Sequence, residues 1–326
     1  MLEHGGNLRA ARQRYGRDDW LDLSTGVNPR GYPIPLLAAD AWHRLPEADP
    51  ELVRAACAWY RAPSLLPVAG TQAAIQALPR LRAPSRVIVA TPSYAEHAHH
   101  WGKHGHMLNE VPYAALDAAV PANDVVVICN PNNPTGAAIA RAQLLDWAAQ
   151  LARRGGWLVV DEAFGDTVPD LSVAAYCEQP GLIVLRSVGK FFGLAGLRLG
   201  FVGAHRSLLD ELADLLGPWA VSGPAQEIAL AALLDDAWQR ATQARLRADG
   251  QRMRHLLLAH GIDAAGSDLF HWWPELRPET FHEHLARHGI WCRLFAQAAR
   301  GIRLGLPADE EGWRRLAVAL DEWRDE

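Results

Sequence analysis

Lysine is almost absent from this chain of 326 residues, which contains only Lys103 and Lys190 although Lys and Arg together number 32. Long apolar runs are absent too: no stretch approaches the roughly 18 uninterrupted apolar residues of a membrane span, and the N-terminus has no secretion-signal pattern. The net charge of -5 gives no electrostatic reason to expect nucleic acid or an anionic membrane as a partner. The cysteines show no CxxC spacing, which indicates reduced thiols in a cytoplasmic protein; they are Cys57, Cys129, Cys177 and Cys292.

Apolar segments alternate with helical patterns between about residues 70 and 203. Continuous apolar runs predict strands buried on both faces, hence an α/β fold with a mainly parallel central sheet between helices. Functional residues should then gather at the carboxyl ends of the strands. The expected strands are "RVIVATP", "DVVVICNP", "GWLVVDEAF", "GLIVLRSV" and "LRLGFVGA".

The pattern changes after "GPWAVSGPAQ" to a long helical stretch at 224–260, followed by mixed helix and strand patterns. We expect an N-terminal arm at 1–28, a large domain at 29–217, and a smaller C-terminal α+β domain at 218–326. A chain of this length can bury a core in each of two domains.

Lys190 lies in "SVGKFFGLAGLRLGF". Unlike arginine, a lysine amine can lose its proton and form a Schiff base with an aldehyde. Asp161 ends the apolar run "WLVV", so its carboxylate needs a cation, and a pyridinium nitrogen would serve. Taken singly, Lys190 could also be a stray lysine in an arginine-rich chain, and Asp161 could simply begin a loop.

Other polar residues at the strand ends suit the remaining parts of such a cofactor. Asn133 in "CNPNNPTG" could donate to a phenolate oxygen, although a turn alone explains an Asn-Pro pair. Tyr94 could stack on a heterocycle. A phosphate could be held by backbone N–H groups, hydroxyls and a guanidinium, from Gly70, Thr71, Ser187 and Arg198.

In this order, the motifs "AGTQAAIQAL", "TPSYAEH", "NPNNPTG", "DEAF" and "SVGKFFGLAGLRLG" resemble the fold-type I pyridoxal-phosphate enzymes, in the branch that contains histidinol-phosphate aminotransferase and threonine-phosphate decarboxylase. The resemblance implies pyridoxal 5'-phosphate as cofactor and a homodimer. It implies that Lys190 forms the Schiff base, Asp161 pairs with the pyridinium, Asn133 bonds the phenolic oxygen and Tyr94 stacks on the ring. Gly70, Thr71, Ser187 and Arg198 would hold the phosphate, and Arg303 in "GIRLGLP" the substrate carboxylate. Phe164 departs from the "DEAY" of many relatives, which puts ordinary transamination in doubt.

The N-terminal motifs "EHGGN" and "STGVNP" are rich in donors for a phosphate. They resemble the decarboxylases of cobalamin biosynthesis more than the aminotransferases. This resemblance implies decarboxylation of O-phospho-L-threonine to (R)-1-aminopropan-2-yl phosphate, with a small phosphorylated amino acid as the ligand. The substrate contacts would come from His4, Gly5, Gly6, Asn7, Gly26, Asn28, Asn133, Arg293 and Arg303. A histidinol-phosphate or related aminotransferase remains the alternative, because it would share every cofactor contact.

A third interpretation is a non-catalytic metal-binding module built on "HAHHWGKHGH", where His97, His100 and His104 would share one helical face. We expect this helix to be largely exposed to solvent and to lack a carboxylate or cysteine partner. The sequence therefore favours an enzyme with no metal site.

Overall fold

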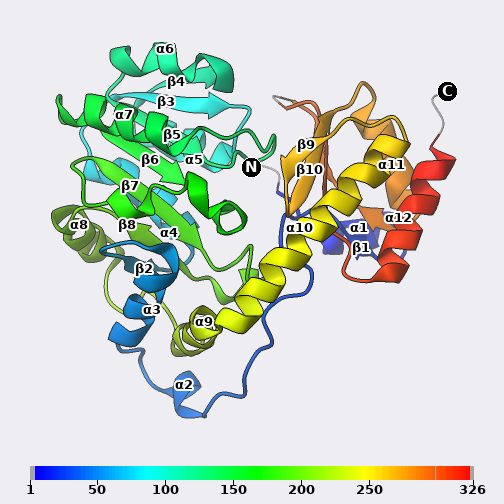
Figure 1. The fold of residues 1–326 in the computed structure, drawn as a ribbon, viewed down its shortest axis with the longest axis horizontal. Coiled ribbons are helices and arrows are strands. Elements are labelled where there is room, and N and C mark those ends of the chain that lie inside the picture. The colour runs from blue at the N-terminus through cyan, green and yellow to red at the C-terminus, as the bar shows by residue number, and fades with distance from the viewer. Residues whose placement is uncertain (1–3, 298, 324–326) are drawn as a thin grey trace.

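The computed structural model describes residues 4–297 and 299–323, and its main element is a seven-stranded sheet (Figure 1). Its strands are β2 (Leu66–Val68), β3 (Arg86–Thr91), β4 (Met107–Pro112), β5 (Val125–Cys129), β6 (Trp157–Asp161), β7 (Leu182–Ser187) and β8 (Gly200–Gly203). They follow the order β2–β8–β7–β6–β5–β3–β4, and within the described chain only β8 runs against its neighbours. The expected α/β fold with a mainly parallel sheet is confirmed.

Alternate residues of the central strands enter two separate hydrophobic cores, one on each face of the sheet. In β5, Val126 and Ile128 pack into one core, while Val125 and Val127 pack into the other. This explains why the strand is apolar at every position instead of at every second one. The first face is covered by α3 (Pro50–Tyr60), α6 (Leu116–Ala119) and α7 (Arg141–Ala152), and the second by α4 (Thr71–Ala77), α5 (Ala95–Lys103) and α8 (Arg206–Leu216).

The strands β2 and β4 were not expected from the sequence. Both lie at the edges of the sheet, and most residues of β4 are exposed. An edge strand needs no continuous apolar run, so the pattern that revealed the central strands is missing here.

The C-terminal region forms a second, antiparallel sheet in the order β12–β13–β10–β9. Its strands are β9 (Ala265–Ser267), β10 (Phe270–Pro274), β12 (Arg293–Phe295) and β13 (Gly301–Gly305), with α11 (Pro278–Arg287) and α12 (Glu310–Glu322) beside them. The expected helical stretch is two helices, α9 (Gly223–Leu234) and α10 (Asp236–Ala259). They separate at Asp235, whose side chain accepts a hydrogen bond from the Trp238 N–H at 2.9 Å and so begins α10. The helix α10 runs from the large domain to the C-terminal sheet (Figure 1).

The described part of the N-terminal segment expected as an arm packs on the C-terminal region. The helix α1 (Leu8–Tyr15) lies near α11, and Tyr15 donates to Glu283 at 2.6 Å. The strand β1 (Leu21–Asp22) pairs in parallel with β11 (Ile290–Trp291). Residues 8–22 therefore belong structurally with the C-terminal domain, and they carry His4 to the space between the two domains.

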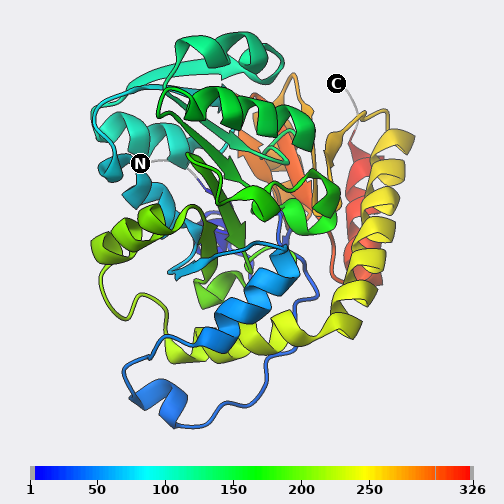
Figure 2. The same ribbon diagram turned by 60° about the vertical axis from the view of Figure 1, so that its left-hand side comes forward.

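The segment around α2 (Asp40–His43) lies at the periphery of the molecule in both views (Figures 1 and 2). It exposes large apolar side chains, Ile34, Leu36, Trp42 and Leu45. None of the described helices has the length and apolar character needed to cross a membrane.

Candidate active site

A cavity of about 200 Å³, here called the inner cavity, lies at the carboxyl ends of β5, β6 and β7. The topology requires this convergence, because parallel strands end at the same edge of a sheet. Every residue that the sequence assigned to the cofactor lines this cavity: Gly70, Thr71, Tyr94, Asn133, Asp161, Ser187, Lys190 and Arg198. The structure thus brings together side chains from positions 70 to 198 along the chain.

Lys190 lies between the inner cavity and a second, outer cavity of about 540 Å³, because it lines both. Burial, reinforced by the charge of Arg303, lowers the pKa of its amine to about 8. The amine nitrogen lies 5.4 Å from the centre of the Phe164 ring. A lysine in such surroundings is neutral often enough near neutral pH to act as a nucleophile.

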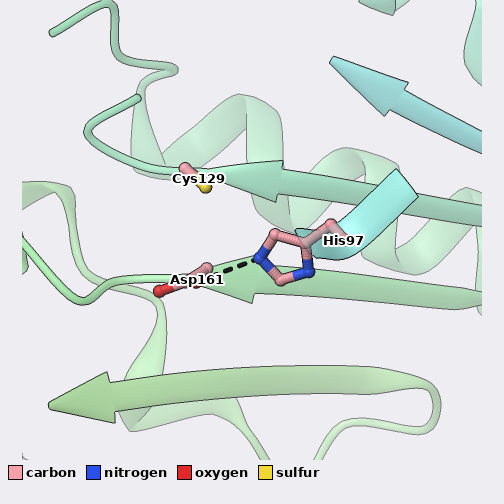
Figure 3. A group of neighbouring side chains, drawn as sticks. All are labelled: His97, Cys129 and Asp161. Carbon is pink, nitrogen blue, oxygen red and sulfur yellow. Dashed lines mark hydrogen bonds and ion pairs between the residues drawn. The ribbon is translucent and has the colours of Figure 1, made fainter. Parts of the chain in front are cut away.

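Asp161 is nearly buried at the end of β6, and both of its oxygens are hydrogen-bonded. One oxygen accepts from the Ala163 N–H at 3.0 Å, and the other lies 3.0 Å from Nε2 of His97, as Figure 3 shows. Burial alone would lower the pKa of His97, but hydrogen bonds with Asp161 and Cys129 outweigh it and raise this pKa to about 10. His97 thus places a positive charge behind the carboxylate and fixes its direction toward the inner cavity.

The expectation of an exposed histidine face on α5 is wrong, because His97 and His100 are buried. The two side chains turn to different partners, His97 to Asp161 and His100 to Glu96 at 3.0 Å, while His104 lies at the end of the helix. The expected lack of carboxylate and cysteine partners is also wrong. Ligand atoms of His97, Cys129 and Asp161 all lie within 4.8 Å of one another. We assign this group to the support of Asp161, since the His97–Asp161 hydrogen bond already joins two of its three members.

One end of the inner cavity has the shape and donors of a phosphate site. Gly70 has a positive φ of 72°, and a Cβ atom at this position would lie 2.6 Å from Nη2 of Arg198. Only glycine leaves this approach open. The hydroxyl groups of Thr71 and Ser187 line the same cavity. A guanidinium, two hydroxyls and nearby backbone N–H groups form a suitable donor set for a phosphate.

The outer cavity adjoins the inner one, and Tyr94, Asn133, Phe164 and Lys190 line both. The buried guanidinium of Arg303 donates from Nη1 to Oδ1 of Asn133 and from Nη2 to the Ser24 carbonyl at 2.9 Å. The first bond leaves the NH₂ group of Asn133 as its remaining donor. Burial and the charge of Arg293 lower the pKa of Arg303, so an anionic ligand would stabilise its charged form.

The N-terminal motifs contribute fewer lining residues than the sequence predicted. His4, Gly5 and Gly26 line the outer cavity, as do Arg293 and Arg303. A side chain at Gly26 would meet the rings of Phe164 and Phe270 at about 3 Å, so this wall requires glycine.

Gly6, Asn7 and Asn28 are not among the residues that line either cavity, and their roles as substrate contacts stay predictions. The Gly6 N–H donates to Ser24 Oγ at 2.7 Å, and Asn7 accepts from the Ala10 N–H at the start of α1. Asn28 is buried, donates to the Phe191 carbonyl at 2.8 Å, and accepts from Arg30 and Arg245. The hydrogen-bonding groups of these residues are used to shape the chain around the site.

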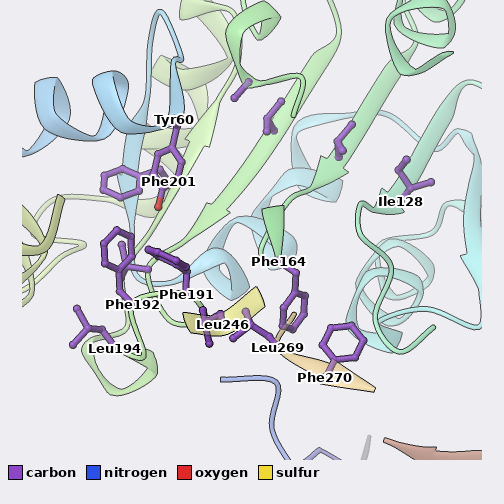
Figure 4. Packing of buried hydrophobic residues seen from close by; sticks show 14 of the residues in the cluster. Tyr60, Ile128, Phe164, Phe191, Phe192, Leu194, Phe201, Leu246, Leu269 and Phe270 are labelled. Carbon is purple, nitrogen blue, oxygen red and sulfur yellow. The ribbon is translucent and has the colours of Figure 1, made fainter. Parts of the chain in front are cut away.

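The Phe164 ring packs edge-on against the ring of Phe270, with the ring centroids 4.8 Å apart. It belongs to the large core cluster, part of which is drawn in Figure 4 together with Phe191 and Phe192. Two aromatic rings without a hydroxyl therefore meet at the contact between the two domains, beside Lys190.

Comparison with known proteins shows the family. Residues 18–322 match the family described as "Aminotransferase class I and II". Threonine-phosphate decarboxylase of Pseudomonas aeruginosa is 53% identical over 323 residues, which are 98% of this chain and 97% of that protein. Threonine-phosphate decarboxylase of a Sinorhizobium species is 44% identical over 333 residues, with 98% and 97% covered. The chain belongs to the aminotransferase class I and II family.

The fold agrees with a solved member of this group. The structure of histidinol-phosphate aminotransferase from Sinorhizobium meliloti in complex with pyridoxal-5'-phosphate matches with a TM-score of 0.84 at 24% identity, covering 96% of this chain and 93% of that one. At this identity the match shows the fold alone.

Proposed function

We propose that this protein is a pyridoxal-phosphate-dependent decarboxylase that converts O-phospho-L-threonine to (R)-1-aminopropan-2-yl phosphate, a reaction of cobalamin biosynthesis. One observation carries the proposal: the described lining of the outer cavity includes four basic side chains and no acidic one. They are His4, Lys190, Arg293 and Arg303. Such a lining suits an amino acid with two anionic groups. The high identity to two threonine-phosphate decarboxylases supports the same substrate.

The inner cavity fits pyridoxal 5'-phosphate. Lys190 offers an amine of lowered pKa, Asp161 offers a carboxylate for the ring nitrogen, and the open approach between Gly70 and Arg198 suits the phosphate. Thr71, Ser187, Tyr94 and Asn133 would complete the contacts. When bound, the cofactor supplies an aldehyde for the substrate amine and a ring that withdraws electrons from the attached carbon.

The substrate's carboxylate is assigned to Arg303 and its phosphate to His4 and Arg293. Arg303 is buried and rigidly held by Asn133 and Ser24, so it can fix the direction of the carboxylate. His4 lies toward the entrance, with about half of its side chain exposed. Lys190, once displaced by the substrate amine, is the acid placed to donate a proton to the substrate's α-carbon after the bond to the carboxylate has broken and carbon dioxide has left.

The second candidate is a histidinol-phosphate or related aminotransferase, which the fold match to such an enzyme favours. Histidinol phosphate carries a phosphate but no carboxylate, so in that reaction Arg303 would bind a carboxylate only in the half-reaction with 2-oxoglutarate. A decisive experiment incubates the holoenzyme with O-phospho-L-threonine and measures carbon dioxide and the amine product. Histidinol phosphate with 2-oxoglutarate is the parallel reaction. Transamination of histidinol phosphate without carbon dioxide release from phosphothreonine would reverse the assignment.

A homodimer is part of the proposal. The segment at 34–45 exposes Leu36 fully and Trp42 to 67%, and contiguous exposed apolar groups are typical of protein interfaces. A second copy of the chain is the proposed partner. The unpaired thiols are compatible with a cytoplasmic location.

A further inference from the structure

His4 is tied to the large domain through a carboxylate that does not line the outer cavity. Its Nε2 lies 2.7 Å from Oε1 of Glu96, in the first turn of α5. The Nδ1 atom of the same ring makes no hydrogen bond to any residue of the described ranges. The ring therefore has one nitrogen fixed by the protein and the other available to a ligand.

Glu96 is itself held in one position by two further donors. Its Oε2 accepts from Nε2 of Gln72 at 2.7 Å and from His100 at 3.0 Å. Burial would raise the pKa of Glu96, but the hydrogen bonds from Gln72 and His4 outweigh it and lower this pKa. The residue is thus a carboxylate, and only 9% of it is exposed.

The two histidines beside Glu96 differ in their exposure to solvent. Burial lowers the pKa of His100, and its Nδ1 is buried without a hydrogen-bond partner, so His100 is a neutral donor. His4 is half-exposed and contacts the other oxygen. Because the Glu96 carboxylate can only accept, Nε2 of His4 carries a hydrogen, and in the imidazolium form Nδ1 carries one as well.

We propose that Glu96 is a positioning residue that holds the His4 ring at the outer cavity, so that Nδ1–H of its imidazolium form donates to the phosphate of the substrate. The inference rests on the proposed function, because it names the residue that prepares its phosphate site. It is consistent with the packing of Gly5 and Gly6 on Ser24, which anchors the other side of the same segment.

The Glu96 carboxylate also connects the proposed site of the substrate phosphate to the cofactor site. Gln72 donates to Glu96 and accepts from the Tyr94 hydroxyl at 3.2 Å. A test must therefore separate an effect through His4 from an effect through Tyr94. The visible absorbance of the bound cofactor provides this separation, because Tyr94 lines the inner cavity and His4 does not.

The experiment compares Glu96→Gln, His4→Ala and the double variant in the holoenzyme. Glutamine keeps the size of Glu96 but removes its charge. We expect each single variant to raise KM for O-phospho-L-threonine by roughly tenfold, the effect of one charge-assisted hydrogen bond, with kcat and the absorbance spectrum nearly unchanged. In the double variant KM should rise no further than in His4→Ala, since Glu96 acts through His4. Independent effects that multiply, or a changed spectrum in Glu96→Gln, would overturn the inference.

Two further variants serve as controls. Glu96→Asp keeps the charge and should bind phosphothreonine more tightly than Glu96→Gln; the reverse order would contradict the electrostatic role. Glu110→Gln, on the exposed edge strand β4, should leave KM unchanged.

Calorimetry with inorganic phosphate separates this inference from the proposed function. If the wild type releases no carbon dioxide from phosphothreonine, the decarboxylase assignment fails, but phosphate should still bind the holoenzyme and bind more weakly to Glu96→Gln and to His4→Ala. Equal phosphate binding by all three proteins, or none by the wild type, would overturn the role of Glu96 itself.

Discussion

Covalent attachment of the cofactor should show the lowered pKa of Lys190. Burial, together with the positive charge of Arg303, lowers this pKa from 10.5 to about 8, and Arg198 adds to the effect against the opposing charge of Asp161. At pH 7 about one amine in ten is then neutral, compared with about one in three thousand for a lysine of ordinary pKa. Since only the neutral amine attacks an aldehyde, the advantage is about three-hundredfold.

The assay mixes apoenzyme with pyridoxal phosphate at a series of pH values and follows the visible absorbance of the covalent adduct. The rates are divided by those of Nα-acetyl-lysine, expressed per neutral amine under the same conditions, which removes the titration of the aldehyde itself. The pKa is lowered, so the amine is protonated below about 8 and neutral above it. The corrected rate should rise with pH, reach half its maximum near pH 8, and then level off. Lys190→Ala should show no attachment although Lys103 remains.

Two variants should move this midpoint in opposite directions. Arg303→Met removes a positive neighbour, so protonation of Lys190 becomes easier and its pKa rises. Asp161→Asn removes a negative neighbour, so the pKa falls. A midpoint near 10.5 in the wild type, or shifts of the same sign in both variants, would refute this account of the site.

Three further outcomes are expected. Asp161→Asn should lower kcat on the order of a hundredfold or more while cofactor affinity changes little, measured by steady-state kinetics and fluorescence titration; near-normal turnover would mean that another carboxylate faces the ring. His4→Ala should raise KM for phosphothreonine. Asn28→Ala should instead lower the free energy of unfolding by about 1–3 kcal/mol, measured by chemical denaturation, because it leaves buried hydrogen-bonding groups unpaired. A raised KM without destabilisation in Asn28→Ala would indicate that Asn28 contacts the substrate. Trp42→Glu should shift the protein from dimer to monomer in sedimentation, and an unchanged dimer would place the interface elsewhere.

The sequence predicted the inner cavity well because its residues follow apolar runs that can be recognised locally. Asp161 and Ser187 each end such a run, and the topology of a parallel sheet then brings them to one edge. Lys190 was recognised because its amine is chemically unusual in a chain rich in arginine. Local pattern and general topology were sufficient for these positions.

The environment of α5 could not be predicted in the same way. The segment "HAHHWGKHGH" is polar, which suggests exposure to solvent. His97 and His100 are nevertheless buried, and each is hydrogen-bonded to a carboxylate, His97 to Asp161 and His100 to Glu96. The contact between His97 and Asp161 joins two segments that are distant in sequence. Tyr94 is the N-cap of α5, and its ring lies edge-on to the His97 ring with the centroids 6.0 Å apart, so the spacing of three residues links His97 to a predicted cofactor residue.

The two cavities differ in how their buried charges are balanced. This difference explains why the chain keeps a buried arginine that lowers the stability of the free enzyme. In the inner cavity Asp161 is balanced by His97, so its charge is stable before any ligand binds. In the outer cavity Arg303 is buried, its Nε has no hydrogen-bond partner, and no ion pair joins it to a carboxylate within the described residues. A buried guanidinium in this state destabilises the folded protein until an anion arrives. Binding of a carboxylate substrate should therefore raise the free energy of unfolding of the protein as well as orient the reacting group. The guanidinium that destabilises the free enzyme is the group that binds the carboxylate in the complex.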